Sequence, residues 1–166
     1  RRRLSLLDVV LYQPEIPPNT GNVIRLCANA GAKLHLVQPL GFSLDDRNLR
    51  RAGMDYRELT DVSLHADWAA CRAALAGRRM FAFTTRASRD HWDAEFADGD
   101  GLVFGNESSG APDWLHAELD ACRLRIPQPN AALRSKIWRT VSIWLDPRRG
   151  HDHDSDRKIW NAIGIS

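Results

Sequence analysis

Short hydrophobic runs alternate with longer stretches of helical composition along this chain. Six runs have the length and apolar content of buried strands, at residues 8–12, 34–37, 59–64, 80–84, 102–104 and 123–126. Three stretches between them have helical composition, at residues 19–30, 66–76 and 112–119. Strands that alternate with helices in this order predict an α/β fold, with a mostly parallel sheet and helices on both faces.

The same pattern predicts one domain over residues 1–150, because no internal repeat or linker divides this part. From His151 to Asp156 the chain is polar and has no apolar periodicity. We therefore expect residues 151–166 to form a solvated C-terminal extension. Alternating His and Asp residues could also bind a metal, but the solvated reading is the one favoured.

Composition narrows the class of protein. Hydrophobic residues make up 43% of the chain and the net charge is only +2, which argues against disorder and leaves a nucleic-acid partner open. The three cysteines are scattered, so we expect no disulfide framework and no metal cofactor. The apolar run after Arg1–Arg3 is interrupted by Asp8 and lacks a cleavage site, and no segment is long enough to span a membrane. These features favour a cytoplasmic protein without membrane association.

The first candidate site is the motif at residues 14–22, followed by Arg25. Its two prolines stiffen the chain that leaves the first strand, and we expect Asn19 or Thr20 near the helix N-cap, where either side chain can cap the helix. Arg25 would then lie on the first helical turns, near exposed backbone N–H groups that suit a phosphate or another anion. A rigid capped turn with a surface arginine is the alternative.

The second candidate site is the loop at residues 105–110, directly after an expected strand. Gly105 and Gly110 allow its backbone to approach a ligand closely, and Glu107 could accept a hydrogen bond from a substrate group. The loop lacks the Lys-Ser/Thr ending of a P-loop, and the chain lacks the Gly-x-Gly-x-x-Gly fingerprint. A plain strand-to-helix turn is an equally good reading of these residues alone.

Two further segments could contribute to binding. Residues 125–129 and 133–135 form a proline-stiffened loop that could wrap an apolar or adenine-like group. Arg47, Arg50 and Arg51 have i, i+3 and i+4 spacing, which places them on one helical face as a candidate phosphate patch. The alternative is a solvated helix face that is partly paired with neighbouring aspartates.

Taken together, these segments resemble the tRNA wobble-nucleotide (cytidine/uridine-34) 2'-O-methyltransferases of the SPOUT superfamily in order and spacing. The run from Val10 to Asn29 carries the longest and most specific part of the resemblance. It continues at residues 49–56, 81–85, 105–110 and 125–127, and covers about residues 6 to 135.

The resemblance implies a SPOUT-type α/β knot, in which the C-terminal segment forms a trefoil knot, and a homodimer. It also implies S-adenosylmethionine as cofactor, S-adenosylhomocysteine as product, and the anticodon stem-loop of tRNA as substrate, bound by Arg47, Arg50 and Arg51. The implied catalytic residues are Asn19, Arg25 and Glu107. The implied cofactor-binding residues are Phe83, Thr84, Gly105, Glu107, Gly110, Ile126, Pro127, Leu133 and Ser135.

The sequence departs from the family pattern after Ser135. An expected Asn is absent between Lys136 and Pro147, Asp146 stands at the expected Tyr position, and Pro147 would end or kink a helix. Two alternatives therefore stay beside the wobble-nucleotide enzyme. One is a 2'-O-methyltransferase for another tRNA or rRNA position, and the other is an RNA-binding SPOUT protein with impaired catalysis.

Overall fold

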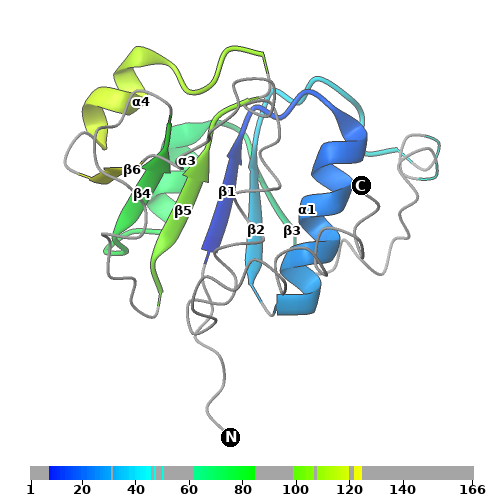
Figure 1. The fold of residues 1–166 in the computed structure, drawn as a ribbon, viewed down its shortest axis with the longest axis horizontal. Helices are drawn as coiled ribbons and strands as arrows, with labels where there is room; N and C mark the ends of the chain where they lie inside the picture. The colour runs from blue at the N-terminus through cyan, green and yellow to red at the C-terminus, as the bar shows by residue number, and fades with distance from the viewer. Residues whose placement is uncertain are drawn as a thin grey trace, which may run out of the picture.

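The computed structural model describes residues 8–30, 32–45, 47, 50, 62–84, 99–106, 108–119 and 122–124. Within these ranges the elements follow one another in an α/β order (Figure 1). They are β1 (Asp8–Tyr12), α1 (Pro17–Ala30), β2 (Lys33–Val37), β3 (Val62–His65), α3 (Trp68–Ala74), β4 (Met80–Phe83), β5 (Gly101–Phe104), α4 (Asp113–Glu118) and β6 (Arg123–Leu124).

The strands form one sheet in the order β3-β2-β1-β5-β4-β6, and every strand pair in it is parallel. The mostly parallel sheet predicted from the sequence is therefore confirmed. From β1 the chain first builds outward through β2 and β3, and then crosses to the other side, where β5 pairs with β1. The strand order thus reverses between β1 and β5, which is the place where open α/β sheets bind their ligands.

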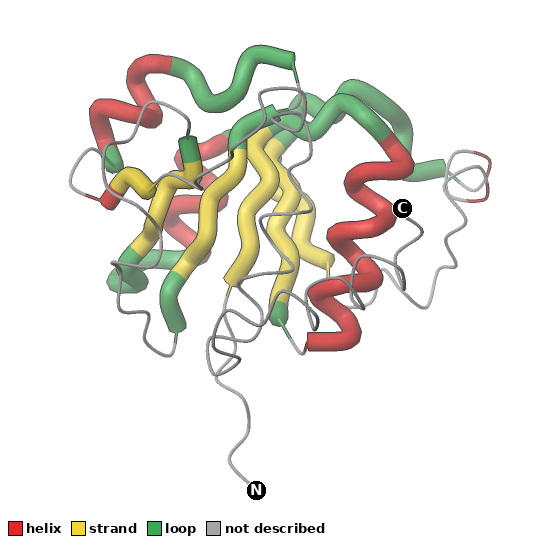
Figure 2. Tube along the Cα trace, in the orientation of Figure 1, coloured by secondary structure: helices red, strands yellow, loops and turns green. Residues whose placement is uncertain are grey.

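Helices cover both faces of the sheet, as predicted. Figure 2 shows α1 in front of the strands and α3 behind them. All five residues of β1 are buried, as expected of a strand that is covered on both faces. On the α3 face, one buried cluster joins the strands to α3 and α4, and it contains Val10, Tyr12, Val37, Trp68, Cys71, Leu75, Met80, Ala82, Val103, Ala111, Leu115 and Leu119.

The strand and helix positions agree with the sequence predictions to within a few residues, with one consequential difference at α1. This helix begins at Pro17, two residues earlier than predicted, so Asn19 and Thr20 lie within its first turn, near its N-cap but not at it. Proline is well tolerated in the first helical turn, because the N–H that it lacks has no partner there. The N-cap of α3 is Asp67, whose carboxylate accepts the backbone N–H of Ala70 at 2.8 Å.

The described residues reach only to Leu124 in the C-terminal part of the chain. The trefoil knot, the divergent segment at 136–147, the domain boundary at residue 150 and the polar extension lie outside the described residues and stay predictions. No helix in the described part is long and apolar enough to cross a membrane.

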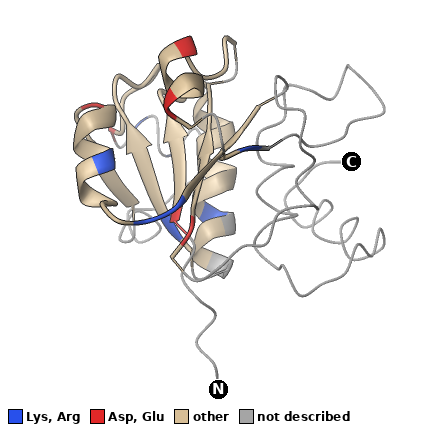
Figure 3. Cartoon of the chain, turned by 90° about the vertical axis from the view of Figure 1, so that its left-hand side faces the viewer, with Lys and Arg blue, Asp and Glu red and all other residues tan. Residues whose placement is uncertain are grey.

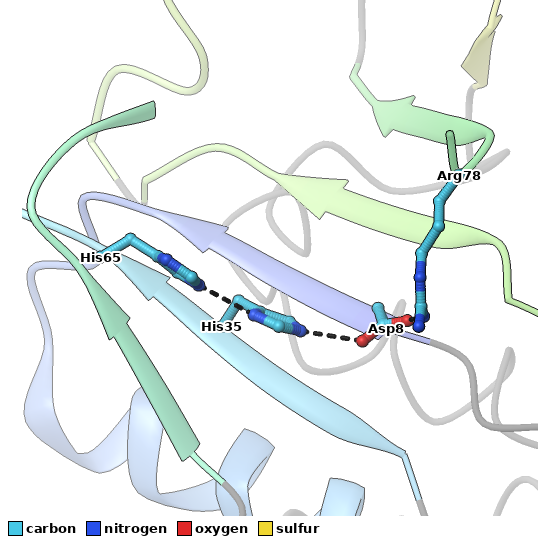
Figure 4. A network of polar contacts seen from close by, with 4 residues as sticks. All are labelled: Asp8, His35, His65 and Arg78. Carbon is cyan, nitrogen blue, oxygen red and sulfur yellow. Dashed lines mark hydrogen bonds and ion pairs between the residues drawn. The ribbon is translucent and has the colours of Figure 1, made fainter. Parts of the chain in front are cut away.

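A polar network that the sequence analysis did not predict crosses the α3 face of the sheet (Figure 4). His35, buried on β2, contacts the carboxylate of Asp8 through Nε2 at 2.8 Å and His65 Nε2 through Nδ1 at 2.9 Å. The two imidazole rings are stacked, and the other carboxylate oxygen of Asp8 pairs with Arg78. The buried aspartate at the start of β1 is thereby held by side chains from β2 and from the segment before β4.

Titration of this network should make stability depend on pH. Burial, and then the charge of Lys33, lower the pKa of His35 below its ordinary 6.5, while burial and then His35 lower the pKa of His65. Below pH 6.5 the unfolded chain therefore takes up protons that the folded chain does not. We predict that the free energy of unfolding, measured in urea, falls as the pH is lowered from 7.5 to 5.0.

The slope of that pH profile identifies the group responsible. In His35→Gln the profile should be flatter over the same range, whatever the absolute stability of the variant. A wild-type profile that is level, or that rises towards pH 5.0, would contradict this role of the histidine pair.

Candidate active site

The candidate site lies beyond the carboxyl ends of β1 and β5, where the strand order reverses. Because β1 and β5 are parallel neighbours in register, with Leu11 opposite Phe104, the two loops that leave them begin side by side. These loops are the segments that the sequence analysis selected as its first and second candidate sites. The fold therefore brings together two motifs that are about 90 residues apart in the chain.

The loop after β1 is held against the neighbouring strand β2 and the segment that follows it. Gln13 adopts a left-handed conformation, with φ of 47°, and its backbone N–H donates to the carbonyl of Val37 at 2.9 Å. The N–H of Gly41 donates to the carbonyl of Pro14 at 2.9 Å. A Cβ on Gly41 would lie 2.7 Å from Cα of Glu15, so only glycine allows this close approach.

The loop after β5 folds back on itself at residues 105–110. The backbones of Asn106 and Gly110 form an antiparallel bridge, and the Asn106 amide oxygen accepts the backbone N–H and the hydroxyl of Ser109, both at 2.8 Å. Gly110 has φ of 71°, and a Cβ on Gly105 would lie 2.2 Å from the backbone nitrogen of Ala111. The turn thus requires glycine at position 105, and the left-handed backbone favours glycine at position 110.

A side-chain hydrogen bond joins these two loops. The hydroxyl of Ser108 donates to Oε1 of Glu15 at 2.7 Å. Glu107, the acidic residue of the second motif, lies next to this contact in the chain but outside the described residues.

Helix α1 carries the two other predicted catalytic residues. Asn19 is half-buried in its first turn, close to the carboxyl edge of the sheet. Arg25 is the ninth residue of the helix, so the expectation that it lies on the first turns is wrong, and the free N–H groups of the helix end do not adjoin it. Instead, its guanidinium Nη2 donates to the side-chain oxygen of Asn22 at 2.9 Å, one turn earlier.

The predicted cofactor-binding residues in the described part gather at the same edge. Phe83, at the end of β4, pairs in register with Phe104, and the two rings stack with centroids 4.9 Å apart. Thr84 follows directly, and Phe83, Thr84, Gly105 and Gly110 are all half-buried. The short strand β6 also ends beside Phe83, so the chain leaves it at this edge. Ile126, Pro127, Leu133 and Ser135 lie outside the described residues, and their contribution stays a prediction.

The predicted basic patch is only partly described. Arg47 and Arg50 are exposed, which is compatible with contact to a phosphate backbone, and Arg51 lies outside the described residues. Figure 3 shows the described Lys and Arg residues spread over several elements rather than gathered on one. Within the described part, no group of three or more His, Cys, Asp or Glu side chains could hold a metal ion.

Glu15, Asn22 and Ser108 lie within the predicted motifs, but no role was predicted for them. The i, i+3 spacing of Asn22 and Arg25 was a signal that could have shown their contact, because such residues are neighbours on a helix. No local pattern could have shown the contact between Glu15 and Ser108, which depends on the pairing of β1 with β5.

Comparisons with known proteins identify the family of the chain. A model of the SpoU rRNA Methylase family matches residues 6–135 of the chain. The tRNA (cytidine(34)-2'-O)-methyltransferase of Methylovorus glucosotrophus is 56% identical over 127 residues, which cover 75% of this chain and 82% of that protein.

Solved structures show the same fold. One, described as giving structural insights into the 2-OH methylation of C/U34 on tRNA, has a TM-score of 0.76 at 42% identity and covers 86% of this chain and 88% of its own. The AdoMet-bound rRNA methyltransferase from Sinorhizobium meliloti has a TM-score of 0.72 at 24% identity and covers 87% of this chain and 56% of its own. Because the identity to the Sinorhizobium meliloti protein is only 24%, this second similarity shows the fold alone.

The tight turn after β5 predicts a large effect of one methyl group. Gly105→Ala should lower the free energy of unfolding by about 3 kcal/mol, because the new Cβ meets backbone atoms that cannot move aside without opening the turn. Gly110→Ala is the matched control: it has open space around the Cβ and should cost only about 1 kcal/mol for its left-handed conformation. Urea unfolding measures both, and equal effects would contradict the packing described at Gly105.

Proposed function

The chain belongs to the SpoU rRNA methylase family, and we propose that it is a tRNA 2'-O-ribose methyltransferase acting on the wobble nucleotide, C or U at position 34. The methyl donor in this proposal is S-adenosylmethionine, and the product is S-adenosylhomocysteine. The observation that carries the proposal is the 56% identity over 127 residues to a tRNA (cytidine(34)-2'-O)-methyltransferase. The family match at residues 6–135 includes both loops of the candidate site. The structural neighbour described for C/U34 methylation supports the same substrate.

The residues at the carboxyl edge fit the proposed cofactor. Phe83 is half-buried at this edge, where its ring stacks on that of the buried Phe104, and the space beside Gly110 is open. An adenine ring can pack against an aromatic side chain such as Phe83, while the charged amino-acid end of the cofactor needs polar partners. Phe83, Thr84, Gly105 and Gly110 would hold it there, together with Glu107, Ile126, Pro127, Leu133 and Ser135.

When bound, S-adenosylmethionine supplies an electrophilic methyl group, so the protein has to align the ribose oxygen and manage its proton. A guanidinium cation is suited to bind anions rather than to accept a proton, so Arg25 is not the proposed base. Its role in the proposal is to bind the neighbouring phosphate and to stabilise the negative charge that develops on the 2'-oxygen. The hydrogen bond to Asn22 fixes the direction of the guanidinium, Asn19 shapes the pocket, and Glu107 is the proposed proton acceptor.

The proposed partners are a second copy of the chain, in a homodimer, and the anticodon stem-loop of tRNA. The exposed side chains of Arg47 and Arg50, together with Arg51, would contact the RNA backbone. The site of action in this proposal is the cytoplasm, where tRNA is modified. The family resemblance, rather than any contact in the described part, supports the dimer.

Methyl transfer to defined RNAs tests the proposed function. The chain should transfer a labelled methyl group to unmodified tRNA that has C or U at position 34, and a single 2'-deoxyribose at that position should abolish labelling. Label that persists with the deoxy substrate would favour a different RNA position. Binding of both cofactor and tRNA without any transfer would favour the impaired, RNA-binding alternative.

Replacement of Arg25 tests the assignment of charge stabilisation. Arg25→Ala should reduce kcat at least 100-fold, since a lost donor to a developing oxyanion typically costs this much, while the affinity for S-adenosylhomocysteine changes little. Asn22→Ala should give a smaller loss, because the guanidinium remains but loses its orienting partner. Near-normal turnover in Arg25→Ala would refute the assignment.

Salt dependence tests the proposed RNA contact. If Arg47, Arg50 and Arg51 bind phosphates, replacing all three with Ala should weaken tRNA binding and reduce the slope of log affinity against log salt by about 2 to 3. The measurement is a binding titration at several salt concentrations. Identical affinity and slope in the triple variant would exclude this patch from the RNA interface.

A further inference from the structure

The contact between Glu15 and Ser108 joins two parts of the chain that have different tasks in the proposed function. Ser108 lies in the loop with Gly105, Glu107 and Gly110, which are proposed to hold the cofactor. Glu15 lies two residues before the start of α1, the helix that carries Asn19 and Arg25. The 2.7 Å hydrogen bond is therefore a direct link between the cofactor side and the ribose side of the site.

Both ends of this link rest on fixed backbone. On one side, Ser108 sits at the tip of a loop closed by the bridge between Asn106 and Gly110 and by the hydrogen bonds of the Asn106 amide oxygen. On the other side, the backbone of Glu15 packs so closely on Gly41 that a Cβ there would lie 2.7 Å from Cα of Glu15. A displacement of either side chain therefore moves a whole loop rather than one flexible residue.

The prolines after Glu15 extend this rigidity into α1. Pro17 and Pro18 form the start of the helix, and their fixed φ leaves few conformations between the carboxylate and the first turn. The position of Glu15 thus determines where α1 begins relative to the sheet edge.

We infer that Glu15 and Ser108 are positioning residues, which set the distance between the cofactor loop and the helix carrying Arg25. The inference rests on the proposed function. A transferred methyl group must lie in line with the attacking oxygen, and a misplacement of about 1 Å in such geometry can lower the rate about 100-fold. A hydrogen bond across the site therefore affects turnover more strongly than it affects folding.

The exposure of the pair separates a positioning role from a structural one. Ser108 is exposed and Glu15 is half-buried, so water can replace either partner in the folded protein. Loss of the contact should shift the melting temperature by no more than about 2 °C, as for other surface substitutions. The rate of methyl transfer should fall much further.

A double-mutant cycle on kcat tests the inference with wild-type chain as the reference. Ser108→Ala and Glu15→Ala should each lower kcat on the order of 10-fold, with little change in the KM for tRNA. The double variant should be no slower than the slower single variant, because each change removes the same contact. Ser108→Thr, which keeps the hydroxyl, and Glu15→Gln, which keeps an acceptor oxygen, should recover most of the turnover.

Ser109→Ala provides the matched control. Its hydroxyl lies in the same loop but bonds to Asn106 rather than across the site, so its loss should cost less than that of Ser108. Three results would each overturn the inference. The first is a loss of about 100-fold in the double variant, with the two single effects multiplied, and the second is an equal loss in Ser108→Ala and Ser109→Ala. The third is a fall in melting temperature large enough to account for the lost activity.

The wild-type chain distinguishes a failure of the positioning role from a failure of the proposed function. A wild-type chain that methylates nucleotide 34 while Ser108→Ala and Glu15→Ala retain full kcat would overturn only the positioning role. A folded wild-type chain that transfers no methyl group to any tRNA would refute the proposed function and, with it, the inference that rests on it.

Discussion

The parallel pairing of β1 with β5 is the contact on which the rest of the site depends. It places a strand from the start of the chain beside one that follows 90 residues later, with Asp8 opposite Gly101 and Leu11 opposite Phe104. Because the register is fixed by buried side chains on both faces, the loops that leave the two strands begin at the same level. The contact between Glu15 and Ser108 follows from that register.

The strands, and the turns that follow them, could be predicted because hydrophobic runs and glycine-bounded turns are local properties. The helix start at Pro17 was not predicted, because Asn19 and Thr20 are of the residue types that N-caps prefer. The first turn of a helix also accepts prolines readily, and here it contains Pro17 and Pro18. That error misplaced Arg25, which is the ninth residue of α1 and donates to the side chain of Asn22 one turn earlier. Contacts across the sheet, such as those of His35 with Asp8 and His65, depend on strand order and could not be read from one segment.

The fold could be predicted from residue patterns, whereas the activity was indicated by a family resemblance. Residue chemistry alone left each motif with a plain structural alternative, whereas the order of the motifs identified a family that the comparisons confirm. The structure adds the spatial arrangement of these motifs. It places the motifs at residues 14–22 and 105–110 together at the carboxyl edge of the sheet, with the stacked rings of Phe83 and Phe104 beside them. The knot and the residues after Leu124 remain predictions from the resemblance.

The central claim is that the cofactor site lies at the carboxyl edge between the loops after β1 and β5. Hydrogen exchange of backbone amides, compared with and without S-adenosylhomocysteine, tests this location most directly. We predict slower exchange at residues 105–111 and at the end of β4, with no change at the opposite edge, around Lys33 and Gly99. Protection confined to that opposite edge, or no protection by a ligand that binds, would contradict the placement of the site.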